Sequence, residues 1–135
     1  MMTDRLFTEA KSAQACAYAP YSGYKVGAAL LDEQGRVWAG CNVENISYGM
    51  TLCAERNAVT AMVSHGGLQV VELLLLTKDA ATPCGACLQV LQEFTPKPEN
   101  LSIHLADENG VRETVTLAVL LPRGFASNEV KSNAT

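Results

Sequence analysis

Positive charge and long apolar runs are the two features that this chain of 135 residues has least of. It carries 10 Lys and Arg against 14 Asp and Glu, which gives a formal net charge of −4, and its basic residues are spread along the sequence. Nucleic-acid-binding domains usually concentrate positive charge on one face, so we expect no nucleic-acid partner. The longest aliphatic run, residues 73–76 with their neighbours, is far too short to cross a bilayer, so we expect no membrane partner.

The N-terminal residues also lack the charged start, apolar stretch and small-residue cleavage site of a secretory signal. The chain contains five cysteines, an odd number. In a sequence without such a signal, these cysteines indicate free thiols or metal ligands rather than a disulfide framework. We therefore expect a cytoplasmic protein.

The pattern of apolar residues predicts one α/β domain. Hydrophobic residues make up 48% of the chain, which suits a single compact core, and there is no repeat or linker. Because two hairpin signals and a helical crossover coexist, we expect a mixed sheet of about five strands. Residues 1–127 would form the domain and 128–135 a polar tail. The expected helices cover about 4–18, 52–65, 84–94 and 117–121, and the expected strands cover 24–31, 36–43, 70–77, 101–106 and 111–115.

Two short segments carry the chemistry: Cys-Ala-Glu at 53–55 and Pro-Cys-Gly-Ala-Cys at 83–87. Together they offer three thiolates and one carboxylate at spacings that suit zinc. Three protein ligands leave the fourth tetrahedral position open for water, which distinguishes a catalytic zinc from a structural one. Glu55 could then move protons between that water and a substrate.

Both segments fall where a helix is expected to begin. Cys84 and Cys87 are three residues apart, so they share one face of a first helical turn. Cys53 and Glu55 are two apart and can converge only if they lie at the start of their helix, with that end pointing at the metal. The unsatisfied amides of a helix N-terminus favour negative charge there.

Arg56 is the nearest cation to this cluster in the sequence. A zinc ion held by three thiolates has a formal charge of −1, which makes it less able to ionise water. We therefore expect Arg56 to donate hydrogen bonds to one or two of the cysteine sulfurs and so restore the acidity of the zinc water.

Two other readings use the same cysteines. A C-x-x-C at a helix start also fits a thioredoxin-like redox motif, although no aromatic residue precedes Cys84 and the Cys53–Glu55 pair would have no role. A structural zinc would need a fourth cysteine, either Cys16 or Cys41. Cys16 lies in an alanine-rich helix, where we expect a small, buried core residue. Cys41 ends a strand and could approach the site.

These motifs resemble those of a known family, the small homotetrameric zinc-dependent cytidine deaminases, over nearly the whole chain. The resemblance implies a three-layer α/β/α sandwich with one Zn²⁺ per subunit. It also implies hydrolytic deamination of cytidine and 2′-deoxycytidine to uridine and 2′-deoxyuridine with release of ammonia, in pyrimidine salvage. The segments that carry it are 19–22 (APYS), 26–30 (VGAAL), 40–45 (GCNVEN), 53–56 (CAER), 83–87 (PCGAC) and 120–122 (LLP) before Phe125.

The resemblance also assigns roles to individual residues. Cys53, Cys84 and Cys87 would hold the zinc and Glu55 would carry protons. Asn42 and Glu44 would bind the ribose hydroxyls, and alternation along an extended segment allows both to face one side. Tyr24, Ala54, Tyr48 and Phe125 would contact substrate or close its pocket, Phe125 from a neighbouring subunit. The sequence departs from the family at Leu88, where many relatives carry Arg, and at Tyr24, where Phe is usual.

Two alternatives to this function remain open in the sequence. One is deamination of another cytosine-containing small molecule, such as blasticidin S. The other is a non-catalytic binding module stabilised by zinc, which would place a fourth protein ligand on the metal and leave Glu55 without a role.

Overall fold

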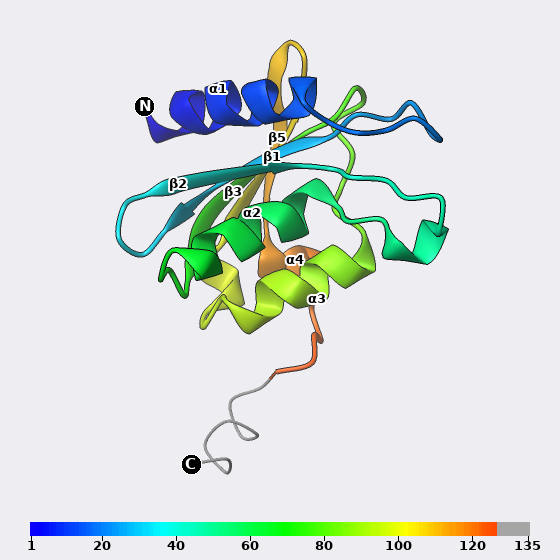
Figure 1. Ribbon diagram of the computed structural model, residues 1–135. Coiled ribbons are helices and arrows are strands. Elements are labelled where there is room, and N and C mark those ends of the chain that lie inside the picture. The colour runs from blue at the N-terminus through cyan, green and yellow to red at the C-terminus, as the bar shows by residue number, and fades with distance from the viewer. Residues whose placement is uncertain (127–135) are drawn as a thin grey trace.

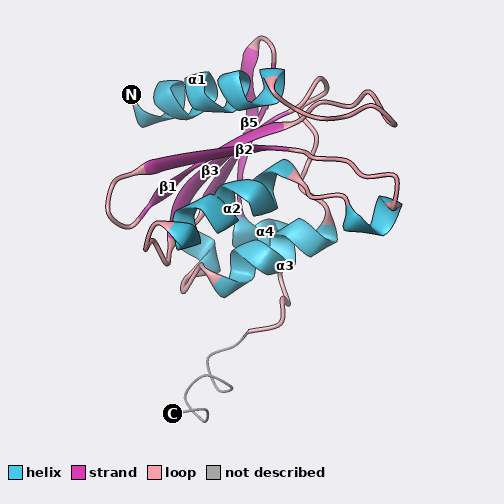
Figure 2. Ribbon diagram, in the orientation of Figure 1, coloured by secondary structure: helices cyan, strands magenta, loops and turns pink. Residues whose placement is uncertain are grey.

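A computed structural model describes residues 1–126 and arranges them as a central sheet with helices on both faces (Figures 1 and 2). The expected tail at 128–135 lies outside the described residues. No described helix has the length and apolar character needed to span a membrane. The elements are helices α1 (Met2–Ala15), α2 (Ala54–Ser64), α3 (Gly85–Glu93) and α4 (Leu117–Leu120), strands β1 (Gly27–Asp32), β2 (Val37–Cys41), β3 (Val70–Leu76), β4 (Ser102–Asp107) and β5 (Gly110–Thr116), and 3₁₀ turns η1 (Tyr48–Met50) and η2 (Pro98–Asn100).

The sheet has five strands in the order β2-β1-β3-β4-β5. β1 pairs antiparallel with both β2 and β3, β4 pairs antiparallel with β5, and β3 and β4 are parallel. The mixed five-stranded sheet predicted from the sequence is therefore confirmed. In the parallel pair, α3 provides the crossover, so the chain leaves the carboxyl end of β3 and enters this helix before returning as β4.

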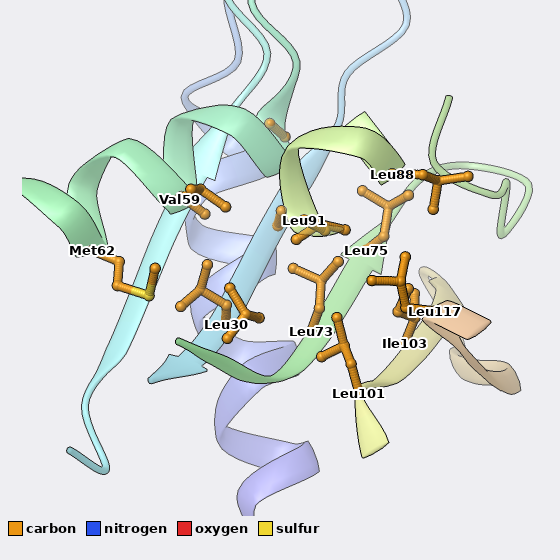
Figure 3. Packing of buried hydrophobic residues seen from close by; sticks show 14 of the residues in the cluster. Leu30, Val59, Met62, Leu73, Leu75, Leu88, Leu91, Leu101, Ile103 and Leu117 are labelled. Atoms are coloured by element: carbon orange, nitrogen blue, oxygen red, sulfur yellow. The ribbon is translucent and has the colours of Figure 1, made fainter. Parts of the chain in front are cut away.

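Strand β3 is the centre of the core, as its nearly continuous aliphatic sequence predicts. Leu73 and Leu75 pack in the larger cluster beneath α2 and α3, whereas Leu74 and Leu76 pack in a smaller cluster beneath α1. Figure 3 shows the larger cluster between the sheet and the helices. α1 alone covers one face of the sheet, and α2, α3 and α4 cover the other, which gives the three-layer sandwich (Figure 1).

Helix α2 lies unusually close to β2, because Gly40 has no side chain. A Cβ atom at Gly40 would lie 2.6 Å from the amide nitrogen of Ala58 and 2.8 Å from the carbonyl oxygen of Ala54, far inside van der Waals contact. The helix that begins next to Cys53 is thus seated directly on the strand backbone.

The β1–β2 hairpin is fixed by a buried carboxylate. Asp32, 1% exposed, accepts hydrogen bonds from the amides of Gln34 and Arg36 at 2.8 and 2.9 Å, from Arg36 Nε at 3.0 Å and from Trp38 Nε1 at 2.8 Å. Burial alone would raise the pKa of Asp32, but these hydrogen bonds outweigh it and lower the pKa to about 2.

The first helix is shorter than its sequence pattern indicates. It ends at Ala15, with Cys16 as its C-cap, whereas apolar spacing extends it to about Tyr18. The amide of Tyr18 instead donates to the carbonyl of Asn42 at 3.0 Å, and that of Glu44 donates to the carbonyl of Tyr18 at 2.9 Å. A tertiary backbone pairing has replaced the last helical turn.

Candidate active site

A pocket of about 300 Å³ opens where α2 and α3 begin, next to the carboxyl end of β3. Its wall comes from four parts of the chain: the segment before β1, the segment after β2, the start of α2, and the end of β3 with the loop that leads to α3. The lining residues are Ser22, Tyr24, Val26, Asn42, Glu44, Thr51, Cys53, Ala54, Glu55, Leu75, Thr77, Ala81, Thr82 and Cys84.

Three sulfurs meet at the base of this site. Cys53 is the N-cap of α2, Cys84 is the N-cap of α3, and Cys87 lies in the first turn of α3. Their Sγ atoms all lie within 4.8 Å of one another, and those of Cys84 and Cys87 are 3.4 Å apart. A tetrahedral zinc with Zn–S bonds of about 2.3 Å needs sulfurs roughly 3.8 Å apart, so the donor set fits zinc with only small side-chain movement.

The structure settles where the other two cysteines lie. No fourth His, Cys, Asp or Glu joins this cluster within residues 1–126, so Cys41 does not complete a four-cysteine site. The prediction that Cys16 is a buried core residue is wrong: its side chain is exposed. Because α1 ends before it, Cys16 is a C-cap residue and no longer follows the buried stripe of Leu6 and Ala10.

Arg56 lies beside the sulfurs, as its position in the sequence suggests. Its Nη2 donates to Cys53 Sγ at 3.5 Å and to the carbonyl of Thr51 at 3.2 Å, while its Nε is buried and has no hydrogen-bond partner among residues 1–126. A hydrogen bond from Cys87 lowers the pKa of Cys53 to about 5; burial opposes the shift and Arg56 adds to it. The negative charge is therefore favoured at the sulfur that the guanidinium contacts.

Glu55 meets the geometric condition that the two-residue spacing imposes. It lies in the first turn of α2, directly after the N-cap and Ala54, and both residues line the pocket with Cys53. The Glu55 side chain is almost completely buried, at 4% exposure. Burial raises its pKa to about 7, and the charge on Cys53 contributes in the same direction. A carboxyl group in this state can accept or release a proton near neutral pH.

Asn42 and Glu44 both line the pocket, on the extended segment that follows β2. Asn42 is buried, donates from Nδ2 to the carbonyl of Tyr24 at 2.8 Å and accepts at Oδ1 from the amide of Val26 at 2.9 Å. The carboxylate of Glu44 accepts from the amides of Tyr21 and Ser22 at 2.9 and 3.1 Å and from the Ser22 hydroxyl. The contacts with Ser22 and Tyr21 lower the pKa of Glu44, since they favour its charged form.

The aromatic residues fall into two groups. Tyr24 lies on the pocket wall, and its hydroxyl donates to Asp79. Tyr48 instead lies in an adjoining hollow with Ser22 and Glu44, and is 74% exposed. Phe125 is 75% exposed and is absent from the lining of its own chain's pocket.

Several pocket residues were not assigned a role from the sequence. Ser22 falls in a segment that resembles a turn, and Thr51, Thr77 and Thr82 have no motif around them. Asp79 does not line the pocket but bonds to Tyr24 and Thr77. Only the resemblance of residues 19–22 to a family segment marks any of them in advance. The remaining residues can be assigned to the pocket only when the loop after β3 is known to lie against the segment before β1.

An open cluster of three sulfurs that shares a pocket with a buried carboxyl group is the arrangement of a zinc-dependent hydrolase. Comparison with known proteins defines the family. Residues 2–102 match the model of the cytidine and deoxycytidylate deaminase zinc-binding region, and the chain belongs to this family. Zinc is therefore the metal for which the cysteine cluster is built.

The similarity to individual members extends over nearly the full chain. A cytidine deaminase from Sporosarcina psychrophila is 40% identical over 132 residues, which cover 96% of each sequence. A cytidine deaminase from Mycobacterium tuberculosis is 51% identical over 86 residues, or 62% of this chain and 65% of the relative. The crystal structure of a cytidine deaminase from Burkholderia pseudomallei superposes with a TM-score of 0.84 at 40% identity, covering 93% of this chain and 100% of that one.

Proposed function

We propose that this chain catalyses the zinc-dependent hydrolysis of cytidine and 2′-deoxycytidine to uridine and 2′-deoxyuridine, with release of ammonia. One observation carries the proposal: the buried carboxyl group of Glu55 and the three sulfurs meet at one pocket, because α2 and α3 both begin there. The cytidine deaminases found among its relatives support the choice of substrate.

Cys53, Cys84 and Cys87 would hold the metal, and no fourth protein ligand joins them within residues 1–126. When bound, zinc supplies the Lewis acidity that makes water a nucleophile near neutral pH. Arg56 would offset part of the thiolate charge through its contact with Cys53. Residues outside the metal's own ligands commonly tune a site in this way.

Glu55 would transfer every proton in the reaction. Its carboxylate takes a proton from the attacking water as the C4–O bond forms, and delivers it to N3 of the pyrimidine ring. It then passes the second water proton to the amino group, so that the C4–N bond breaks and ammonia leaves. One carboxyl group can act as base and then as acid because burial raises its pKa to about 7.

Asn42 and Glu44 would orient the sugar. An asparagine amide group has two N–H donors, and each oxygen of a carboxylate can accept more than one hydrogen bond. Asn42 uses one amide hydrogen on Tyr24, and the Glu44 carboxylate is held at fixed orientation by the Ser22 contacts. Both could therefore receive ribose hydroxyls without moving, which aligns the base with the reacting water at little entropic cost.

The active enzyme would be a homotetramer whose pockets are completed by neighbouring subunits. Residues 43–52 form a lobe closed by paired backbone bonds between Val43 and Leu52, and it presents Ile46 at 81% exposure next to the exposed Tyr48 and Met50. Several large apolar side chains exposed together on one short segment are typical of an interaction surface. Phe125 would reach a neighbour's pocket, since Gln89 fixes its backbone at 3.0 and 2.9 Å and leaves its ring exposed.

We place the enzyme in the cytoplasm, in pyrimidine salvage. All five cysteines are free thiols, as expected of a reducing compartment, and three of them are needed as metal ligands. The acidic composition supports a small nucleoside as the substrate rather than a polynucleotide.

The test is to follow the loss of cytidine absorbance with purified, zinc-loaded protein and the variant Glu55→Gln. We expect the variant to keep one zinc per chain and to lose activity by about 10²-fold or more. Glu99→Gln, an exposed residue of η2, is the matched control and should stay active. Full activity of Glu55→Gln with its zinc in place would refute the role of Glu55. A panel of cytidine, 2′-deoxycytidine, cytosine and blasticidin S would establish the substrate.

A further inference from the structure

Three side chains and one backbone amide form a chain of hydrogen bonds along the rim of the pocket. The Tyr24 hydroxyl donates to Asp79 Oδ1, and Thr77 Oγ1 donates to the same oxygen at 3.2 Å. Thr77 Oγ1 also accepts from the amide of Ala81 at 2.8 Å. Tyr24 and Asp79 are 55 residues apart in sequence, so this link joins two separate parts of the fold.

The two segments that it joins both line the same pocket. Tyr24 precedes β1, whereas residues 77–83 connect β3 to Cys84, the N-cap of α3. Thr77, Ala81 and Thr82 of this loop line the pocket together with Tyr24. The loop contains Ala80 with a φ of +52°, a left-handed conformation that costs a non-glycine residue free energy. Such a backbone persists when surrounding contacts hold it in place.

We propose that Asp79 is a positioning residue for nucleoside binding, which fixes the ring of Tyr24 against the loop between β3 and α3. The proposal rests on the nucleoside deaminase function described above. Asp79 does not line the pocket and would not touch the reacting atoms. Asp79 would act through Tyr24, whose hydroxyl donates to it, and through Thr77, which also donates to it. Thr77 in turn accepts a hydrogen bond from the amide of Ala81 and so shapes the loop between β3 and α3. A phenylalanine at position 24 could not make the link to Asp79.

A ring held in one orientation loses little rotational freedom when a base packs against it, so the benefit appears in binding. The chemical step depends instead on Glu55 and the metal ligands. Loss of Asp79 should therefore raise KM and the dissociation constant, with a much smaller effect on kcat. A residue needed only for folding would lower the melting temperature or the zinc content, and it would not separate KM from kcat in this way.

The experiment compares Asp79→Ala, Asp79→Asn, Tyr24→Phe and the double variant Tyr24→Phe/Asp79→Ala, all zinc-loaded. Deamination kinetics give KM and kcat, and calorimetry gives the affinity for the product uridine. We expect Asp79→Ala and Tyr24→Phe each to raise KM and weaken uridine binding about three- to tenfold, the effect of one hydrogen bond. The double variant should be no worse than either single one, since both remove the same link.

Asp79→Asn should restore most of the affinity, because an asparagine Oδ1 still accepts from the tyrosine hydroxyl. Glu99→Ala is the matched control: Glu99 is also exposed and acidic, but it lies just before β4, at the opposite end of the parallel pair from the loop that follows β3. It should leave KM, uridine affinity and melting temperature unchanged.

Three outcomes overturn the proposal: unchanged KM and uridine affinity in Asp79→Ala, single effects that multiply in the double variant, or a loss of affinity that tracks loss of zinc or of folded protein. Failure of the underlying function is recognised separately. If zinc-loaded wild-type protein binds uridine but does not deaminate cytidine, the deaminase assignment fails. The calorimetric comparison of the variants still decides the role of Asp79.

Discussion

Arg56 Nη2 lies 3.5 Å from Cys53 Sγ, and it is the one cationic group in residues 1–126 that donates a hydrogen bond to the three-sulfur cluster. Leu88, directly after Cys87, is 7% exposed and packed in the core, so it brings no charge to the cluster. Within residues 1–126, Arg56 and the N-termini of α2 and α3 are therefore the groups that can offset the charge of the three thiolates.

Replacing Arg56 with Gln should weaken the metal site. The cluster would lose both a hydrogen bond and a positive charge, and outer contacts of this kind are typically worth about 10- to 100-fold in metal affinity or activity. Competition with a chromogenic chelator measures the affinity, and the deaminase assay measures the activity. Arg5→Gln, on the exposed part of α1, is the control. Unchanged zinc affinity and activity in Arg56→Gln would show that the helix N-termini alone stabilise the thiolates.

Only three of the five cysteines should matter for zinc. Cys87→Ser removes a sulfur from the cluster and should reduce bound zinc well below one per chain, with loss of activity. Cys41→Ser and Cys16→Ser should each retain one zinc, because neither residue belongs to the cluster. Elemental analysis of the purified variants gives the ratio. A zinc deficit in Cys41→Ser would reinstate a four-cysteine site.

Asp32→Asn should destabilise the fold by about 2 kcal/mol, because an amide replaces a buried carboxylate that accepts four hydrogen bonds. The folded-state pKa of Asp32, about 2, lies below its unfolded value, so this carboxylate stabilises the protein above about pH 4. That contribution is lost as the pH falls through about 2.

Urea unfolding at several pH values tests this. The difference in unfolding free energy between wild type and Asp32→Asn should narrow as the pH falls from about 4 to about 2. Glu113→Gln, an exposed change on β5, should show no such difference. A difference that stays constant with pH would mean that Asp32 acts by shape and not by charge.

Ile46→Asp should break the proposed tetramer. It places a charge on the exposed apolar lobe at 43–52, where it would have to be buried against a neighbouring subunit. Light scattering should report a mass close to one quarter of the wild-type value or close to one half of it. Leu68→Asp changes a residue of similar character, 62% exposed, before β3 and should leave the mass unaltered. Unchanged mass in Ile46→Asp would place the interface elsewhere.

Local sequence signals were sufficient for most of the fold. The two hairpin signals and the aliphatic run of β3 each act over a few residues, and the strands lie close to where these signals indicate. The same holds for the metal site. Cys53 and Cys84 are the N-caps of α2 and α3, and the start of a helix is determined largely by the few residues around it.

Contacts between segments that are far apart in the chain could not be predicted from the sequence. The end of α1 is decided by the pairing of Tyr18 with the backbone around Asn42, which no helical spacing reveals. The exposure of Cys16 follows from that early ending. The Tyr24–Asp79 link likewise needs the order of the strands in the sheet, because β1 and β3 must be neighbours before their flanking segments can meet.

The central place of β3 has a consequence for how the protein acquires its metal. Cys53 precedes this strand and Cys84 follows it, so we expect the sulfurs to come together when β3, which lies between α2 and α3 in the sequence, takes its place in the sheet. The partner strands lie on either side in the sequence, and such long-range pairing forms slowly. We therefore expect a newly made chain to complete its sheet before it can capture zinc, so that metal loading reports on finished folding.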